Sequence, residues 1–181
     1  MRHTVLFLAL ALAASSALAK DKDISKVNGS IHAQSGQSYG DLDTVNGSIR
    51  IDAGATVGSV ETVNGSISSE NKAVLSSAST VNGAIKLGEQ TKVGGEVSTV
   101  NGAVTVGKLS ELGADLSTVN GKILIYQSNI TGLVSTVNGD ITVGTRSRIH
   151  GGILVDKTSG ISWGQTEKTT HPDRAKCGGG G

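Results

Sequence analysis

Hydrophobic and polar positions recur along most of this chain with a period of 18 or 19 residues. The clearest marker is the tripeptide Val-Asn-Gly, whose seven copies are separated by 18, 18, 18, 19, 19 and 18 residues. A repeat of this length is too short for a pair of helices, so it predicts one coil of a β-solenoid. The copies begin at Val27, Val45, Val63, Val81, Val100, Val119 and Val137.

Apolar residues fall into columns when the residue before Val-Asn-Gly is counted as position one. Position two is always valine, position six is isoleucine or valine, and positions eight and fourteen are mostly apolar. Ile130 stands one place before position fourteen in the sixth coil, and a further apolar column lies near the end of each coil. Polar residues between positions six and eight indicate a strand. Positions two, eight and fourteen are six apart, which predicts three short sides with these residues inside.

The Asn-Gly dipeptide is expected to form a corner, because both residues tolerate a positive φ. Asn-Gly also occurs in β-hairpins, but no second turn recurs in each repeat, so parallel stacking is favoured over hairpins. Parallel stacking predicts a ladder of asparagines in which each amide bonds to the next coil. We expect the extra residue of the two longer coils between position fourteen and the next threonine. The ladder comprises Asn28, Asn46, Asn64, Asn82, Asn101, Asn120 and Asn138.

The chain divides into four segments around this repeat. Residues 1–19 combine a basic start, an apolar run and a final Ala-Leu-Ala, which is typical of a secretory signal peptide cleaved after Ala19. Residues 20–25 are a charged lead-in, and residues 26–155 form the predicted all-β, single-stranded parallel β-helix of about seven coils. Residues 156–181 are polar and are expected to form a flexible tail; alternatively, Trp163 caps the last coil.

The leader implies an exported protein, located in the periplasm, on the cell surface or in the medium, with no membrane span after cleavage. Removing Arg2 leaves 15 basic and 15 acidic residues, so the formal net charge is zero. The absence of net positive charge argues against electrostatic binding to nucleic acid or anionic lipid, because both need a basic patch. Cys177 is the only cysteine, which excludes a disulfide framework within the chain.

The repeat resembles that of a known class of exported proteins. Thr-Val-Asn-Gly-Ser-Ile-Arg-Ile at residues 44–51 and its variants resemble the β-strand-repeat domain of unknown function found in many exported bacterial proteins and often labelled adhesin. The resemblance covers residues 26–155 and implies an adhesin-like role. More distantly, the repeat is similar to the bactofilins, cytoskeletal β-helix proteins that polymerise end to end. That second likeness implies a right-handed helix, although bactofilins lack a secretory leader. Neither resemblance brings site residues with it.

Residues that carry chemistry are scattered over the repeat. His32 and His150 stand near opposite ends, which disfavours the histidine-based chemistry of hexapeptide-repeat acyltransferases. Asp41 and Asp43 form a lone acidic pair, for which a solvated edge is favoured over a calcium site. Metal-binding cysteine pairs and a Ser-His-Asp arrangement are also missing from the sequence. We therefore expect no catalytic, cofactor-binding or metal-binding residues, and no enzyme.

The remaining regular feature is the threonine at position one, which we expect to point outward. Such a flat hydroxyl face could hold a polysaccharide, whereas ice binding would need a second threonine column. The sequence thus predicts a non-catalytic envelope or surface protein, adhesin-like or self-assembling end to end; the alternative is a rigid carbohydrate-binding module that recognises envelope polysaccharide. The expected face comprises Thr44, Thr62, Thr80, Thr99, Thr118 and Thr136.

Overall fold

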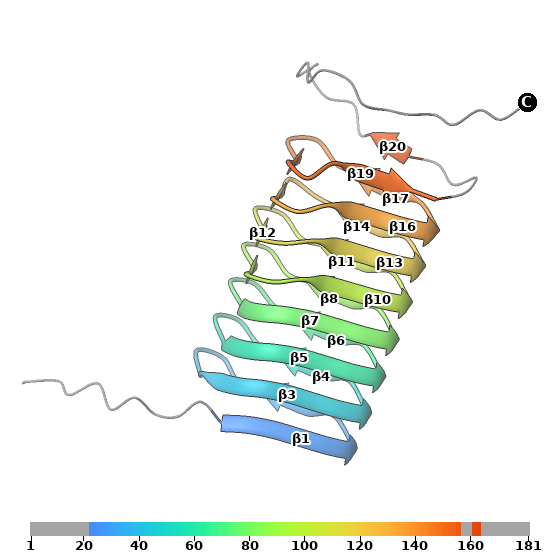
Figure 1. Ribbon diagram of the computed structural model, residues 1–181. Helices are drawn as coiled ribbons and strands as arrows, with labels where there is room; N and C mark the ends of the chain where they lie inside the picture. The colour runs from blue at the N-terminus through green and yellow to red at the C-terminus, as the bar shows by residue number, and fades with distance from the viewer. Residues whose placement is uncertain (1–21, 157–160, 164–181) are drawn as a thin grey trace, which may run out of the picture.

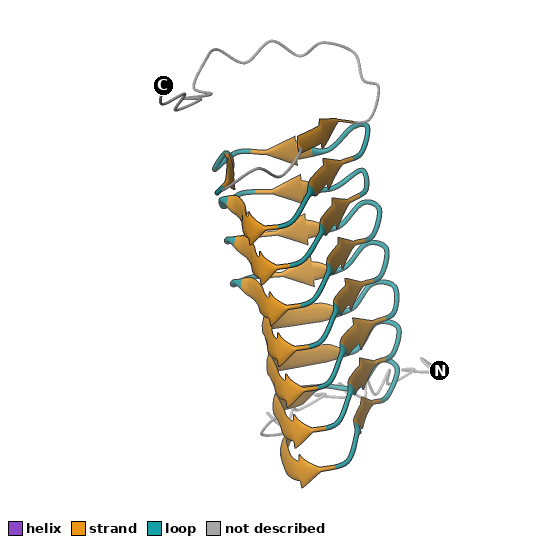
Figure 2. Cartoon of the chain, turned by 90° about the vertical axis from the view of Figure 1, so that its right-hand side faces the viewer, coloured by secondary structure: helices purple, strands orange, loops and turns teal. Residues whose placement is uncertain are grey.

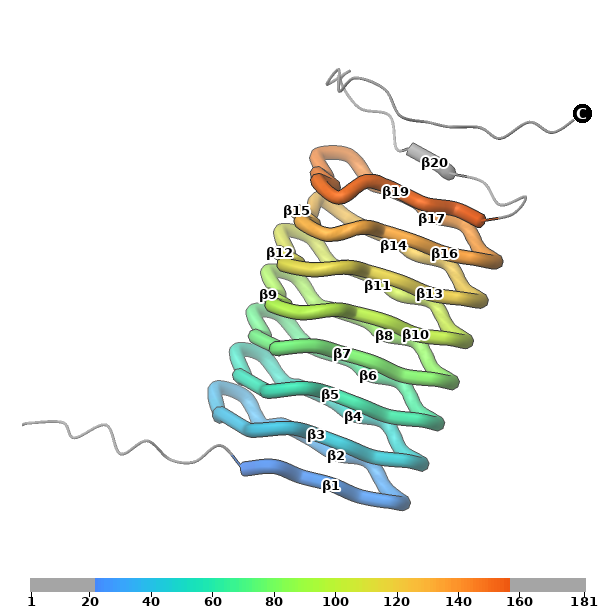
Figure 3. The backbone as a smooth tube through the Cα atoms, in the orientation of Figure 1, coloured from blue at the N-terminus to red at the C-terminus, as the bar shows by residue number. Residues whose placement is uncertain are grey.

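The computed structural model describes residues 22–156 and the backbone of residues 161–163. This part of the chain contains only strands and connecting turns, and its strands stack in parallel into a rod (Figure 1). In Figure 3 the near strands run from left to right as the chain climbs from its blue end to its red end, so the coil is right-handed. The predicted β-solenoid of about seven coils is confirmed. The predicted leader at residues 1–19 and Cys177 lie outside the described residues.

One side of the rod is an eight-stranded parallel sheet of three-residue strands. In the strands between Ile31 and Val143, positions six and eight point inward and position seven points outward, as the alternation predicted. At position six, isoleucine or valine therefore stacks on isoleucine or valine from coil to coil, whereas the column at position eight also contains Ala33, Ser69 and Leu87. The strands are β2 (Ile31–Ala33), β4 (Ile49–Ile51), β6 (Ile67–Ser69), β8 (Ile85–Leu87), β11 (Val104–Val106), β14 (Ile123–Ile125), β17 (Ile141–Val143) and β20 (Ile161–Trp163).

The other two sides belong to a twelve-stranded sheet, seen edge-on in Figure 2. In the early coils one long strand covers both sides, and in the later coils two shorter strands replace it. The long strands are β1 (Lys22–Asn28), β3 (Tyr39–Asn46), β5 (Thr56–Asn64) and β7 (Val74–Asn82). The later pairs are β9 (Lys92–Val93) with β10 (Val97–Asn101), β12 (Glu111–Leu112) with β13 (Leu116–Asn120), β15 (Asn129–Ile130) with β16 (Val134–Asn138), and β18 (Arg148–Ile149) with β19 (Ile153–Val155).

The extra residue of the longer coils lies where the long strand breaks. Leu75 pairs with Val93, and Ala78 pairs with Val97, so the two-residue gap of β7 becomes a three-residue gap in the next coil. This is the predicted place, between position fourteen and the next threonine. Ile130 pairs with Leu112, which confirms that the sixth coil keeps its column with a residue one place early.

A single narrow core runs the length of the rod. It is built from the columns at positions six, eight and fourteen and from the column near the end of each coil. The last column lies three residues before the valine of position two and two residues before the threonine of position one. That column comprises Leu42, Val60, Ala78, Val97, Leu116 and Val134, all fully buried.

The predicted orientation of positions one and two is wrong. Along β10, Val97 and Thr99 point inward while Val100 lies outside, 39% exposed. Strand alternation forces this result, because residues two apart share a face and residues three apart do not. The valines of position two therefore form an outward column, and the threonines of position one are buried.

Each buried threonine bonds to the coil before it. The Thr99 hydroxyl donates to the carbonyl oxygen of Gly83 at 3.0 Å, and Thr62 donates to Gly47 at the same distance. The same bond recurs in all six threonine-bearing coils between Thr44 and Thr136. A buried hydroxyl is stable only when it is paired, so the threonine can replace an apolar residue in the core.

The asparagine ladder is present, but glycine has a different role from the one expected. From Asn46 to Asn138, each asparagine Nδ2 of the ladder donates to the Oδ1 of the previous coil at 2.9–3.0 Å. Of the seven glycines that follow, only Gly29 has a positive φ. A Cβ on Gly65 or Gly102 would instead overlap the carbonyl oxygen of the glycine one coil earlier. Close stacking, and not a left-handed backbone, requires glycine at this corner.

Residues with a left-handed backbone conformation lie at another corner of each coil. This corner comes just before the long strands β3, β5 and β7 and before the short strands β9, β12, β15 and β18. This column begins with glycine and continues with larger residues, which is unusual because a side chain disfavours this backbone conformation. Its members are Gly36, Gly54, Lys72, Gln90, Leu109, Gln127 and Arg146, with φ between 45° and 68°.

The two ends of the rod differ. At the C-terminal end, β20 pairs with β17 and places Ile161 beside Ile141 and Trp163 beside Val143. The repeat thus continues beyond the expected boundary at Val155. At the N-terminal end, Lys26 stands where other coils have threonine, and its Nζ donates to the carbonyl oxygen of Ser30 at 2.8 Å.

Candidate interaction surfaces

The most regular outward feature of the rod is a column of valines on the twelve-stranded sheet. Six of them are 37–40% exposed, and Val27 on the edge strand is 67% exposed. A second outward column, two residues earlier on the same strands, carries hydroxyl and acidic side chains. We call the two columns together the valine face. They are Val27, Val45, Val63, Val81, Val100, Val119 and Val137, with Ser25, Asp43, Glu61, Ser79, Ser98, Ser117 and Ser135.

A shallow groove of about 660 Å³ follows the valine face across the first five coils. It lies between the two columns, and the buried threonines form its floor. The N-terminal part of the groove carries Lys26, Asp43 and Glu61, whereas Ser79 and Ser98 line its later part. The face is therefore apolar along one edge, charged at one end and neutral at the other.

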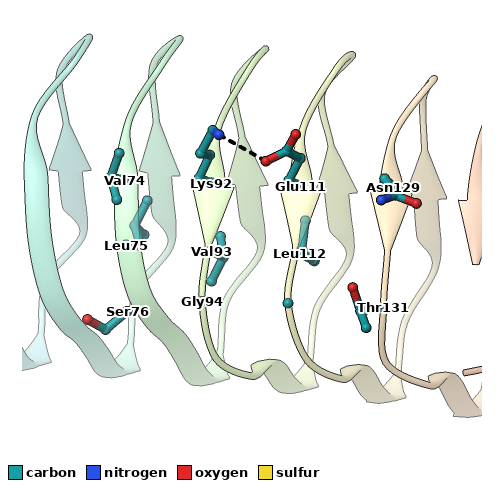
Figure 4. Close-up of a pocket in the computed structure, with 11 residues that line it drawn as sticks. Val74, Leu75, Ser76, Lys92, Val93, Gly94, Glu111, Leu112, Asn129 and Thr131 are labelled. Carbon is teal, nitrogen blue, oxygen red and sulfur yellow. Dashed lines mark ion pairs between the residues drawn. The ribbon is translucent and has the colours of Figure 1, made fainter. Parts of the chain in front are cut away.

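A second surface, which we call the polar hollow, lies beside the short strands β9, β12 and β15. Lys92, Glu111 and Asn129 project from successive coils, as Figure 4 shows, and Lys92 Nζ lies 3.0 Å from Glu111 Oε2. The hollow has a volume of about 440 Å³ and is also lined by glycines, which leave space between the rows. Its remaining lining residues are Ser76, Gly94, Gly113 and Thr131 together with the apolar Val74, Leu75, Val93 and Leu112.

The predicted site residues, the asparagines and the threonines, hold neighbouring coils together. The seven asparagines lie in a single exposed ladder whose amides bond to one another. The six threonines are buried, with relative exposures of 2–4%, so they form no outward binding face. The hydroxyl face that was expected to hold polysaccharide is therefore not built from threonine.

The histidines and acidic residues are not brought together into a reactive cluster. His32 Nε2 lies 2.8 Å from Asp52 Oδ2, and Arg50 links Asp52 to Glu70 on the exposed face of the eight-stranded sheet. The hydrogen bond from His32, assisted by Arg50, holds the pKa of Asp52 below its usual range. His150, near the other end, contacts the Ile130 carbonyl oxygen.

The acidic pair at residues 41 and 43 also has partners. Asp41 accepts from the backbone amide of Ser59 at 2.8 Å, and Asp43 accepts from the hydroxyl of Ser25 at 3.3 Å. Within the described residues, no three metal-ligating side chains lie close enough together to hold an ion. No helix long and apolar enough to cross a membrane occurs among the described residues.

The chain was compared with protein-family models, with curated proteins and with solved structures. No family model matches the chain, and no match was found among curated proteins or solved structures. The chain is a β-solenoid repeat protein.

The valine face was missed at the sequence level although the chain carried a signal for it. Leu42 and Val45 are three residues apart on a single strand, so they cannot both point inward. Because apolar residues usually fill a protein core, valine and not threonine was predicted at the interior position. The spacing from the column at the end of each coil, followed through the strand, gives the observed arrangement.

Proposed function

We propose that this chain is a non-catalytic, exported envelope or surface protein that serves as a rigid rod and binds a protein partner through its valine face. The observation that carries the proposal is the unbroken column of exposed valines along the rod. Contiguous exposed apolar surface on a protein marks interaction sites, whereas isolated apolar residues do not. Threonine suits exposed strand positions as well as valine does, so strand formation alone does not require this column.

Rigidity supports the same role. The valines belong to strands whose backbone amides and carbonyls are paired between coils, so they are held in a fixed row before any partner arrives. A preformed surface loses little conformational freedom on binding.

Site-specific photo-crosslinking tests the proposal in cells that express the chain with its leader. A photoreactive residue at Val100 should form adducts with a partner protein. The matched control is Thr105 in the same coil, which points outward from the eight-stranded sheet and should give none. Equal adducts at both positions, or none at Val100, would contradict the proposed face. Recovery of the chain in the cytoplasm would contradict export.

A second candidate, recognition of envelope polysaccharide, is favoured by the polar hollow. Lys92, Glu111 and Asn129 follow one another at the spacing of the coils, and such side chains donate to and accept from sugar hydroxyls. The hollow contains no aromatic side chain among its lining residues, which removes the usual stacking contribution. We therefore rank this function second.

A pull-down on purified peptidoglycan separates the two candidates. If the hollow binds glycan, Asn129→Ala and Glu111→Gln should each reduce retention, while Lys86→Ala on the opposite sheet should leave it unchanged. Retention that none of the three variants alters would remove the hollow as a glycan site.

A further inference from the structure

We infer that the partner of the valine face is a second copy of this chain, docked face to face and antiparallel. This inference rests on the proposed function and names its partner. Two copies would meet valine column to valine column, related by a twofold axis through the coil that contains Val81. In this arrangement Val45 lies opposite Val119, and Val63 lies opposite Val100.

The repeat period selects such a partner. The valines of the face recur at the strand spacing of a parallel sheet, about 4.8 Å. A partner places an apolar side chain opposite each of these valines only if its own side chains repeat at the same spacing. Another copy of this rod meets that requirement at every coil, as identical side chains do in the dry interfaces of stacked sheets.

The acidic residues of the valine face favour the antiparallel orientation of the two copies. Asp43 and Glu61 lie in the second and third coils, whereas the corresponding positions in the fifth and sixth coils are Ser98 and Ser117. With the twofold axis at Val81, Glu61 faces Ser98, whose hydroxyl can donate to it. Asp43 faces Ser117, whose hydroxyl donates to Glu96 at 3.4 Å within the chain and would turn to Asp43 in the dimer. A parallel arrangement centred between the two columns would press each carboxylate against a valine, which is costly without a hydrogen bond.

The size of the face predicts a weak complex. Six coil steps give a length of about 29 Å, and five residues of strand give a width of about 16 Å. Two such faces bury on the order of 1,000 Å², below the roughly 1,200–2,000 Å² of stable complexes. We expect a reversible dimer that forms at high protein concentration.

The N-terminal end of the rod favours lateral over end-to-end contact. In the interior, the carbonyl oxygen at position five accepts from the coil before it, as Ser48 accepts from the Ile31 amide at 3.0 Å. Ser30 has no preceding coil, and Lys26 supplies the donor instead. An incoming strand would have to displace this charged side chain, which is a known way of protecting a sheet edge.

Sedimentation equilibrium of the exported, purified chain carrying Cys177→Ser tests the inference. We expect a monomer–dimer equilibrium that Val81→Lys weakens at least about tenfold, because two lysines would then meet at the twofold axis. Thr105→Lys, on the opposite sheet, should leave the equilibrium unchanged. In the same background, Val45→Cys and Val119→Cys chains should form disulfides with each other when mixed, and much less with themselves.

The other outcomes are decisive as well. A dimer unaffected by Val81→Lys would place the contact at the rod ends or another face and overturn the inference. Disulfides formed mainly between two Val45→Cys chains would show a parallel arrangement. A strict monomer at every concentration would also overturn it. If the photoreactive residue at Val100 still captured another protein, the proposed function would remain and only the identity of the partner would be wrong.

Discussion

The N-terminal and C-terminal coils build the same cross-section in different ways. In β3, β5 and β7 the strand runs unbroken for eight or nine residues across two sides of the rod. From Lys92 onward, each equivalent strand is split into two shorter pieces by an added residue. The eight-stranded sheet opposite shows no such change, since β4, β6, β8 and β11 all have three residues.

The buried corner before the short strands changes its chemistry at the same place. Ala55 and Ala73 occupy it in the early coils, and the Ala55 amide bonds to the Asp52 carbonyl oxygen of its own turn at 3.2 Å. Thr91, Ser110 and Ser128 take over later. There each backbone amide bonds to the hydroxyl of the next coil, as Thr91 does to Ser110 Oγ at 3.1 Å.

The comparison shows what a solenoid must preserve. A coil can change its strand lengths and its corner residues and still pair the corner amide in more than one way. At Ala55 the turn closes on itself, whereas from Thr91 onward a hydroxyl of the next coil accepts from the corner amide.

The largest expected effect comes from the boundary between the two regions. Ile85→Asp buries an unpaired carboxylate in the fully buried core of the central coil and should cost about 4 kcal/mol or more. Because the total free energy of unfolding is typically about 5–15 kcal/mol, this variant should lose its β-type circular dichroism at a much lower urea concentration than the unaltered chain. Lys86→Asp, one residue on and outward, is the control in urea denaturation. Comparable losses from both variants would mean that the core column is wrongly assigned.

A smaller effect tests the hydroxyl corner of the later coils. Ser110→Ala removes a hydroxyl that donates to the Gly88 carbonyl oxygen and accepts from the Thr91 amide. Leaving that buried amide unpaired should cost about 1–3 kcal/mol. Ser117→Ala, an outward serine of the same region, should change stability by less than about 0.5 kcal/mol. If the two variants have the same melting temperature, the hydroxyls do not stabilise the corner.

The hydrogen bond from the buried threonine occurs in both regions, and its loss should reduce stability equally in each. Thr44→Val and Thr99→Val keep the buried volume but remove the hydroxyl that bonds to a glycine carbonyl oxygen. Each should cost about 1 kcal/mol, the usual net worth of such a bond. The exposed neighbour Val100→Thr serves as control in the same melting experiment. A large difference between Thr44→Val and Thr99→Val would show that the regions depend on this bond unequally.

The smallest effect is a gain in stability confined to the later coils. Leu109 is 64% exposed and has a φ of 58°, a backbone conformation that asparagine adopts more readily. Leu109→Asn should therefore raise stability by about 0.5–1 kcal/mol, part of the cost of a left-handed residue. Lys108→Asn, the residue before it, should give no gain. An unchanged melting temperature for Leu109→Asn would mean that neighbouring contacts compensate for the strain.

The sequence by itself determined the number of coils, the stacking direction and most of the core. These follow from local spacing: Ile49 and Ile51 alternate with Arg50 on one strand, and the same pattern returns at each repeat. The place of the extra residue, between β9 and β10, was also predictable, because the two longer coils keep their apolar columns only if the extra residue lies between them. Periodicity carries this information because parallel stacking places equivalent residues on one another.

Only the tertiary structure decided what happens between coils. Thr99 is buried because the coil before it offers the Gly83 carbonyl oxygen, and no local pattern records that partner. Gly65 must lack a side chain because Gly47 lies directly beneath it, not because its own φ demands it. The outward position of the valines follows from the strand spacing, but only the neighbouring coil supplies the partner that makes the inward threonine stable. Contacts between residues 15 to 18 positions apart settle these choices, and they exist only once the rod has formed.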